Sequence, residues 1–317
     1  MAKRKNKKNQ QALKGLVAVI IIAIITILGD KIKLDNINNL AEEVSSNNVA
    51  TNQVVADSSE AVDGEDVDVY YLDVGQADSI LVQSNGMNML IDAGNNDMGK
   101  TVVRDLQALG IKKIDVLIGT HPHEDHIGGL DDVIKNFDIG TIYMPKVQTN
   151  TKTFEDVLDA INEKGLKITS PEVGYKFNVG NAVCEVMNCG TGTSEEKSNL
   201  NLSSIVIRMT YGEQSFLFMG DASIKTEEYL LNNYILPNVD ILKVGHHGSY
   251  TSTSTDFINV IKPKYSVISV GENNMYKHPN KSVLDILDNT KLFRTDVDGT
   301  IEVKISKKRY KIKTYVP

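Results

Sequence analysis

The chain of 317 residues contains only two cysteines, Cys184 and Cys189. Two thiols five residues apart cannot form the disulfide framework of a small secreted protein. Their spacing also matches no thiolate zinc motif. They could pair in an oxidising compartment, but we favour the interpretation that both are buried free thiols. A metal site in this chain would therefore be built from imidazole and carboxylate groups.

Positive charge is scarce outside the N-terminus. Residues 1–28 contain six Lys or Arg and no Asp or Glu, so residues 29–317 hold 28 basic and 41 acidic side chains, a balance of −13. This balance argues against the basic surface with which many proteins coat nucleic acid. A metal cluster can still supply local positive charge for a phosphate group.

The N-terminal segment predicts attachment to a membrane. Its basic residues are followed by residues 16–28, which are apolar except for Thr26 and lie near the lower length limit for a membrane-crossing helix. A signal peptide has a similar layout, but no small-x-small cleavage site precedes Asp30. We therefore expect residues 1–29 to be an uncleaved single-pass anchor, with a cleaved signal as the alternative. The basic flank predicts that the rest of the chain lies outside the cytoplasm, at the cell membrane.

The remaining chain divides at about residue 67. Residues 30–66 are rich in Asn, Ser, Asp and Glu and have no aromatic residue, which predicts a flexible linker. Residues 67–317 alternate between strand and helix patterns, which predicts an α/β (α+β) hydrolase domain with two sheets covered by helices. Strands are predicted at 67–72, 79–83, 87–91, 116–119, 182–187, 204–210, 214–219, 239–244, 265–270, 300–305 and 309–315. Helices are predicted at 101–109, 130–137, 154–164, 226–233, 255–261 and 282–287.

All six histidines lie in three short segments that are flanked by Gly or Pro. The segments are 121–126, with His121, His123 and His126; 245–249, with His246 and His247; and the loop that contains His278. Imidazole nitrogens and carboxylate oxygens are the ligands that suit zinc and similar divalent ions. The clustering therefore predicts a metal site, and a metal that only staples loops together is the weaker alternative.

The order of these segments resembles the metallo-β-lactamase fold. The pattern His-x-His-x-Asp-His at 121–126 is the signature of that fold, and residues 90–94, with Asp92, look like its first motif. Asp221, after an apolar strand, looks like the fourth motif, and His246-His247 looks like the fifth. The resemblance implies an αββα sandwich.

A narrower resemblance is to the β-lactamase-like domain of the ComEC competence DNA-uptake family, where this domain is regarded as a nuclease. It is carried by residues 72–79, 120–123, 126–130, 242–249 and 294–299. Ala77 departs from the usual glycine. The single candidate membrane segment leads us to expect no channel. No histidine lies between His126 and His246, so the third-motif histidine is absent and residues 199–204 take its place.

The resemblance implies which residues hold metal. We expect one ion on His121, His123 and Asp221, and a second on Asp125, His126, His246 and a bridging Asp221. The missing third-motif histidine makes a weaker site, or Mn²⁺ in place of Zn²⁺, plausible, with one or two ions bound. Asp92 is expected to accept a hydrogen bond from a ligand histidine.

The candidate catalytic residues are Asp125, His247 and His278. The two histidines could bind the substrate phosphate or protonate the leaving alkoxide, although His278 could equally be an ordinary loop residue. Sequence leaves open which of His246 and His247 ligates metal.

We therefore expect a membrane-anchored, extracytoplasmic, metal-dependent hydrolase of phosphodiesters, with a polyanionic substrate, DNA foremost, and no nucleotide cofactor. The alternatives are a cell-surface phosphoesterase or amide hydrolase acting on teichoic acid, peptidoglycan fragments or a β-lactam, and a non-catalytic binding module.

Overall fold

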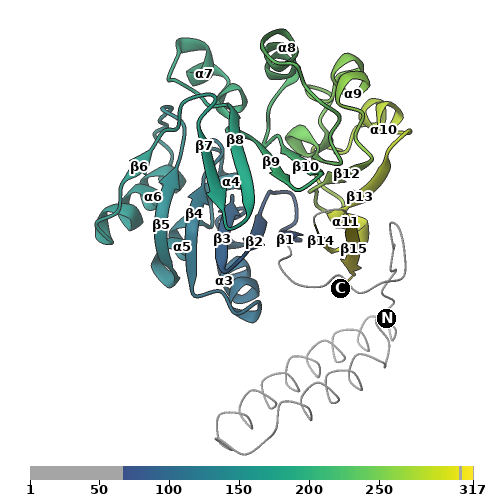
Figure 1. Ribbon diagram of the computed structural model, residues 1–317. Helices are drawn as coiled ribbons and strands as arrows, with labels where there is room; N and C mark the ends of the chain where they lie inside the picture. The colour runs from purple at the N-terminus through teal and green to yellow at the C-terminus, as the bar shows by residue number, and fades with distance from the viewer. Residues whose placement is uncertain (1–66, 307–308, 317) are drawn as a thin grey trace, which may run out of the picture. The chain divides into compact units, whose positions relative to one another are not determined.

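The computed structural model describes residues 67–306 and 309–316. The predicted anchor, 1–29, and linker, 30–66, lie outside these residues. Among the residues that are described, no helix is long and apolar enough to cross a membrane. The two predicted sheets and the helices that cover them are present (Figure 1).

The first sheet has eight strands in the spatial order β15-β14-β1-β2-β3-β4-β5-β6. Strands β15 to β3 pair antiparallel, whereas β3 to β6 pair parallel. The strands are β1 (Val67–Tyr71), β2 (Ile80–Ser84), β3 (Met87–Ile91), β4 (Lys113–Ile118), β5 (Asp138–Tyr143), β6 (Ile168–Thr169), β14 (Thr300–Ile305) and β15 (Tyr310–Tyr315).

The second sheet has seven strands in the spatial order β13-β12-β11-β10-β9-β8-β7. Here β10 to β13 pair parallel and β7 to β10 pair antiparallel. The strands are β7 (Lys176–Val179), β8 (Ala182–Asn188), β9 (Val206–Tyr211), β10 (Gln214–Phe218), β11 (Ile241–Lys243), β12 (Tyr265–Ile268) and β13 (Lys291–Arg294).

Helices cover the outer face of each sheet (Figure 1). Apolar side chains of α3 (Gly99–Ala108), α5 (Leu130–Asn136) and α6 (Lys152–Glu163) pack on the first sheet. Those of α8 (Ile224–Asn233), α9 (Thr255–Ile261) and α10 (Lys281–Ile286) pack on the second. Five short helices lie in loops: α4 (Glu124–Ile127), α7 (Ser194–Ser198), η1 (Leu200–Ser203), η2 (Gly245–Gly248) and α11 (Thr295–Asp298).

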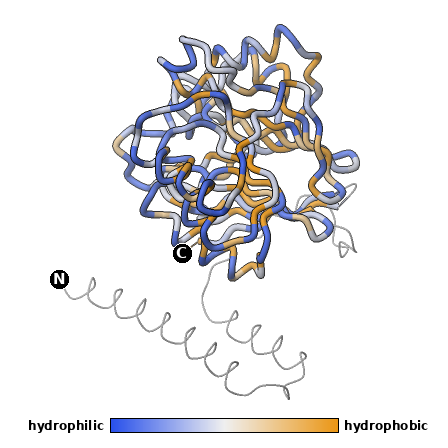
Figure 2. Tube along the Cα trace, turned by 90° about the vertical axis from the view of Figure 1, so that its left-hand side faces the viewer, coloured by the Kyte–Doolittle hydropathy of each residue, from blue (hydrophilic) through white to orange (hydrophobic). Residues whose placement is uncertain are grey.

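Strand alternation explains the layers. Along β1, Val69 and Tyr71 point into the core between the two sheets, whereas Tyr70 and the following Leu72 point toward the helices. Successive side chains of a strand face opposite sides, so a strand covered on both faces must be apolar throughout. Figure 2 shows the hydrophobic residues gathered along the strands inside and the hydrophilic ones on the outer loops.

Within residues 67–306 and 309–316, every predicted strand and helix is present, with ends that differ by up to three residues. Strands β5, β6, β7 and β13 were not predicted. In β5, Gly140 weakens the apolar pattern, yet a side chain there would meet the Asp115 carbonyl oxygen at 2.4 Å. Close approach of β4 and β5 therefore requires glycine at this position.

Cys184 and Cys189 are free and buried, as predicted.

Candidate metal centre

The functional side chains come from loops that follow parallel strands. Asp92 follows β3 and His121 follows β4, while Asp221 follows β10 and His246 follows β11. Since β3 pairs parallel with β4, and β10 pairs parallel with β11, the carboxyl ends in each pair meet at one sheet edge. Loops at such an edge present side chains from a rigid frame.

The loop at 121–126 places its histidines by starting a helix. His123 precedes α4, and its carbonyl oxygen accepts hydrogen bonds from the backbone N–H groups of His126 and Ile127 at 3.2 and 3.0 Å. His121 and His126 are completely buried. His121 Nε2 lies 2.9 Å from His123 Nδ1. The loop therefore presents three imidazoles within a few ångströms.

Asp92 orients the His126 ring by binding its Nδ1 atom. Its Oδ1 accepts from the Thr120 backbone at 2.8 Å, and its Oδ2 accepts from the Thr120 hydroxyl at 2.7 Å and from His126 Nδ1 at 2.8 Å. The predicted hydrogen bond between Asp92 and a motif histidine is thus present. Because the Nδ1 proton is held by Asp92, the Nε2 atom of His126 faces the site.

Asp221 lies at the centre of the cluster. Its Oδ1 is 3.1 Å from His126 Nε2 and 3.5 Å from His247 Nε2. Its Oδ2 is 3.6 Å from His246 Nε2 and 3.9 Å from His121 Nε2. One carboxylate thus reaches both sides of the site, which is the arrangement predicted for a bridging ligand.

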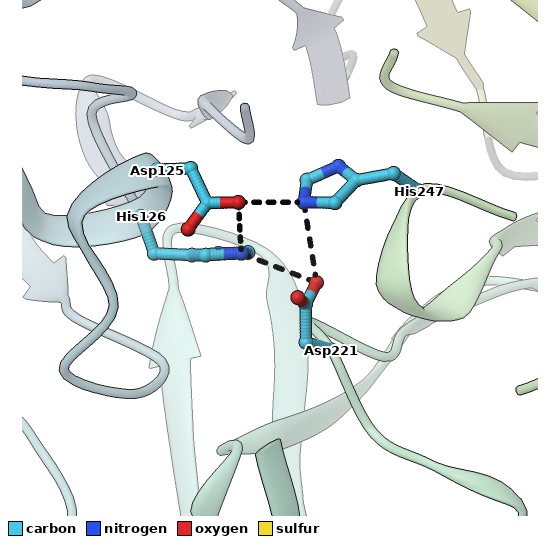
Figure 3. Close-up of side chains that lie close together, drawn as sticks. All are labelled: Asp125, His126, Asp221 and His247. Atoms are coloured by element: carbon cyan, nitrogen blue, oxygen red, sulfur yellow. Dashed lines mark ion pairs between the residues drawn. The ribbon is translucent and has the colours of Figure 1, made fainter. Parts of the chain in front are cut away.

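His246 and His247 both have a left-handed backbone, with φ of 48° and 52°. This conformation is uncommon for residues other than glycine and is often retained at functional sites. It turns the His247 ring into the cluster, where its Nε2 lies 3.3 Å from Asp125 Oδ2 (Figure 3). The His246 ring also contacts Asp221, but it lines the open side of the site and is partly exposed.

Among the described residues, three groups of side chains have ligand atoms within 4.8 Å of one another, and two of them contain Asp221: His121, His123 and Asp221; and Asp125, His126, Asp221 and His247. The first group is the predicted one. In the second group His247 stands where the sequence scheme placed His246. Both histidines contact Asp221, so the assignment of His246 as a ligand remains a prediction.

The ligand atoms of the cluster suit a divalent ion. His126 Nε2, His247 Nε2 and Asp221 Oδ1 are all buried and have no hydrogen-bond partner among the described residues. Unsatisfied buried polar atoms are rare and point to an ion or water that they surround. Imidazole and carboxylate donors suit Zn²⁺ or Mn²⁺.

The electrostatics of the cluster favour a bound cation. Burial acts to lower the pKa of His126, but the carboxylates of Asp221 and Asp92 outweigh it and raise that pKa well above its usual value. Burial acts to raise the pKa of Asp221, but His126 and His247 outweigh it and hold that pKa well below its usual value. The carboxylates thus require positive charge, which protons or a divalent ion can supply.

A cleft of about 260 Å³ opens onto the cluster. Asp125, Asp221 and His247 line it together with residues that the pattern did not single out, Gln76 and Tyr276. The lining residues are Gln76, His123, Glu124, Asp125, Asp221, His246, His247, Tyr276 and His278.

His278 lies at this cleft, 5.6 Å from His246 between ring centroids. Ring contacts connect all six histidines of the chain in this way. Burial, followed by the nearby His246 and His247, lowers the pKa of His278 to about 4. Its imidazole is therefore neutral at pH 7.

The segment 199–204, which takes the place of the third motif, does reach the site. Asn201 Nδ2 lies 3.3 Å from His246 Nδ1, and the buried Asn201 Oδ1 has no hydrogen-bond partner among the described residues. The sequence pointed to this segment, but it could not show that Asn201 contacts the cluster.

The family model described as "Metallo-beta-lactamase superfamily" matches residues 72–272. The chain therefore belongs to the metallo-beta-lactamase superfamily, and the predicted resemblance is confirmed at this level.

The narrower resemblance to ComEC-family competence proteins is confirmed as well. ComE operon protein 3 of Bacillus subtilis (strain 168) is 32% identical, over 79% of this chain and 34% of that protein. Competence protein ComA of Neisseria gonorrhoeae is 31% identical, over 77% of this chain and 33% of that protein. The chain thus spans about a third of the length of these relatives. Ribonuclease Z of Clostridium perfringens is 29% identical, over 47% of this chain and 40% of that protein.

Proposed function

We propose that this protein is a metal-dependent phosphodiesterase that cleaves DNA. The observation that carries the proposal is that three buried ligand atoms without a hydrogen-bond partner among the described residues, on His126, His247 and Asp221, lie together beside an open cleft that His247 and Asp221 line. When bound there, divalent ions would lower the pKa of a water molecule and neutralise charge that builds on phosphoryl oxygens. The set of ligands is retained in full except for the third-motif histidine, which argues against a non-catalytic binding module.

The residues of the chain have distinct roles in this proposal. His121 and His123 would hold one ion, and Asp125, His126 and His247 the other, with Asp221 shared. His278 is neutral at pH 7, so its N–H would donate a hydrogen bond to a phosphate oxygen rather than act as a strong acid.

Exposed side chains at the cleft (Tyr276) and on loops near it support a nucleic-acid substrate. Tyr276 is 60% exposed, and its ring stacks on His278 at 5.7 Å between centroids and 26° between planes. Met275 is 84% exposed, and Tyr250 is 71% exposed. Asn280 Oδ1 accepts from the Tyr250 backbone N–H, which joins Tyr250 to the loop that carries His278. Exposed aromatic rings bind unpaired bases by stacking, worth about 1–3 kcal/mol per base.

The name of one relative supports a nucleic-acid substrate, since it is called a ribonuclease. The charge of −13 on residues 29–317 favours the second candidate, a small phosphoester of the cell surface, since a long polyanion would be repelled. Cleavage of short single strands is compatible with both the acidic body and the exposed aromatic side chains.

We further propose that the enzyme is anchored in the cell membrane with its hydrolase domain outside the cytoplasm. The support is the run of six basic and no acidic residues before and at the start of the apolar segment, with Asp30 after it. Protease added to intact protoplasts should then remove the domain and leave a small anchored stub. Protection of the domain until lysis would reverse this topology, and a mature N-terminus near residue 30 would show a cleaved signal.

The activity is tested on the full chain with Mn²⁺ or Zn²⁺ and three substrates in parallel. They are a single-stranded oligonucleotide, bis-p-nitrophenyl phosphate and the β-lactam nitrocefin. We expect hydrolysis of the two phosphodiesters, loss of both in EDTA, and loss in His123→Ala but not in the surface control Asp131→Asn. Full activity in EDTA would rule out the mechanism. Hydrolysis of nitrocefin alone would favour the amide hydrolase.

A further inference from the structure

A buried ion pair lies beneath the metal centre and takes no part in the chemistry proposed above. Lys243, the last residue of β11, is completely buried, and Asp78 is 1% exposed. Their Nζ and Oδ2 atoms lie 2.9 Å apart, and the same ammonium donates to the Val244 carbonyl oxygen at 3.0 Å. A buried lysine is rare, and an apolar pair of similar volume often stabilises a fold at least as well. The pair therefore calls for an explanation other than stability.

The second oxygen of Asp78 faces a metal-centre histidine. Asp78 Oδ1 lies 3.4 Å from His247 Nδ1 as an electrostatic contact and has no hydrogen-bond partner among the described residues, because that Nδ1 donates to the Ser269 carbonyl oxygen at 2.9 Å. A neutral imidazole carries a single N–H, so holding the proton at Nδ1 leaves a lone pair at Nε2. The Nε2 atom is the one that faces Asp125 and Asp221.

The backbone of Asp78 joins the segments that carry the centre. Its N–H donates to the Asp125 carbonyl oxygen at 3.1 Å, and its carbonyl oxygen accepts from the Gly94 N–H at 2.9 Å. Asp78 therefore connects the loop of Asp125 to the loop of His247, two segments more than 100 residues apart in the chain.

Lys243 also affects where a divalent ion can bind. Asp78, Asp92 and His126 form a third group whose ligand atoms lie within 4.8 Å of one another. The Lys243 ammonium already forms an ion pair with Asp78 at this position. The ion pair holds the carboxylate beside His247, and the ammonium charge disfavours a divalent ion on the Asp92 side of His126.

We propose that the Asp78–Lys243 pair is a positioning device for His247. The Ser269 carbonyl oxygen accepts the Nδ1 proton of the ring, Asp78 lies against the same edge of the ring and directs Nε2 toward the metals, and Lys243 holds Asp78 in place. The inference rests on the proposed metal centre, but not on the identity of the substrate.

The test compares Asp78→Asn, Lys243→Met and the double variant Asp78→Asn/Lys243→Met with the unchanged chain. Three quantities are measured on full-length protein: thermal stability, affinity for Zn²⁺ and Mn²⁺ by competition with a chelator, and the His247 tautomer by ¹⁵N NMR. We expect the Nδ1–H tautomer in the unchanged protein. Each single variant should lose about 10- to 100-fold in metal affinity, the range seen when a partner of a ligand histidine is removed.

The double variant separates positioning from a structural role. It has no uncompensated buried charge, so its stability should recover, whereas its metal affinity should stay at least about tenfold low. Recovery of both stability and affinity would overturn the proposal, as would an Nε2–H tautomer in the unchanged protein. If the single variants fail to fold, the double variant still distinguishes a positioning role from a structural one. Absence of nuclease activity would contradict the proposed function without affecting these measurements.

Discussion

Asp221→Asn is the perturbation that tests the centre most directly. The substitution keeps the size of the side chain and removes one charge at 1% exposure, with His126 Nε2 at 3.1 Å and His247 Nε2 at 3.5 Å. Removing one partner of a buried charge pair lowers the stability of a fold by about 3–5 kcal/mol. Removing a group that only orients a metal ligand lowers metal affinity by about 10- to 100-fold, so we expect loss of the shared ligand itself to lower metal affinity and turnover by at least about 100-fold.

The assay measures turnover on a single-stranded oligonucleotide together with metal affinity by chelator competition. Asp131→Asn is the matched control, because Asp131 forms an exposed pair with Lys135 whose loss is worth about 0–1 kcal/mol. Circular dichroism should show both variants folded. Turnover and affinity within a few-fold of the unchanged protein in Asp221→Asn would refute the idea that this carboxylate bridges the two ligand groups.

Three further outcomes follow from the structure. Protein purified without added metal should hold clearly fewer than two ions per chain, because the smaller ligand group has only three members; two zinc ions surviving dialysis would reveal another ligand, and Asn201 is the nearest candidate. Burial raises the pKa of Cys184 and Cys189 to about 12, so a thiol reagent at pH 8 should label neither until the protein is unfolded; rapid labelling of the native protein would contradict their burial. Burial acts to raise the pKa of Glu302, but hydrogen bonds from Tyr315 and another tyrosine outweigh it and lower that pKa. The stability that Glu302 contributes is therefore present at neutral pH and lost as pH falls through its folded pKa. Glu302→Gln should lower the free energy of unfolding at pH 7 by about 1–3 kcal/mol and weaken its decline in acid; an unchanged unfolding curve across pH would contradict this.

The local pattern of the chain was sufficient for most elements and for the membership of the site. Alternation of apolar residues and short turn signals reports directly on strands, because side-chain direction in a strand repeats every two residues. It therefore located β1 and the strands that deliver His121 and Asp221. Strand β5 was not predicted because Gly140 interrupts its apolar pattern. Glycine is required there because a side chain would collide with the Asp115 carbonyl oxygen on the neighbouring strand.

The ligand types were likewise determined by sequence, since imidazole and carboxylate groups in three short segments already indicated a metal centre. Only the tertiary structure places the His247 ring within the ligand group and the His246 ring against Asp221 from the more exposed side. That choice depends on two left-handed backbone conformations, which loop packing imposes. The pairing of Asp78 with Lys243 was beyond sequence for a similar reason. Asp78 lies in the loop between β1 and β2 of the first sheet, whereas Lys243 ends β11 of the second, and they meet because the edges of both sheets close around the same centre.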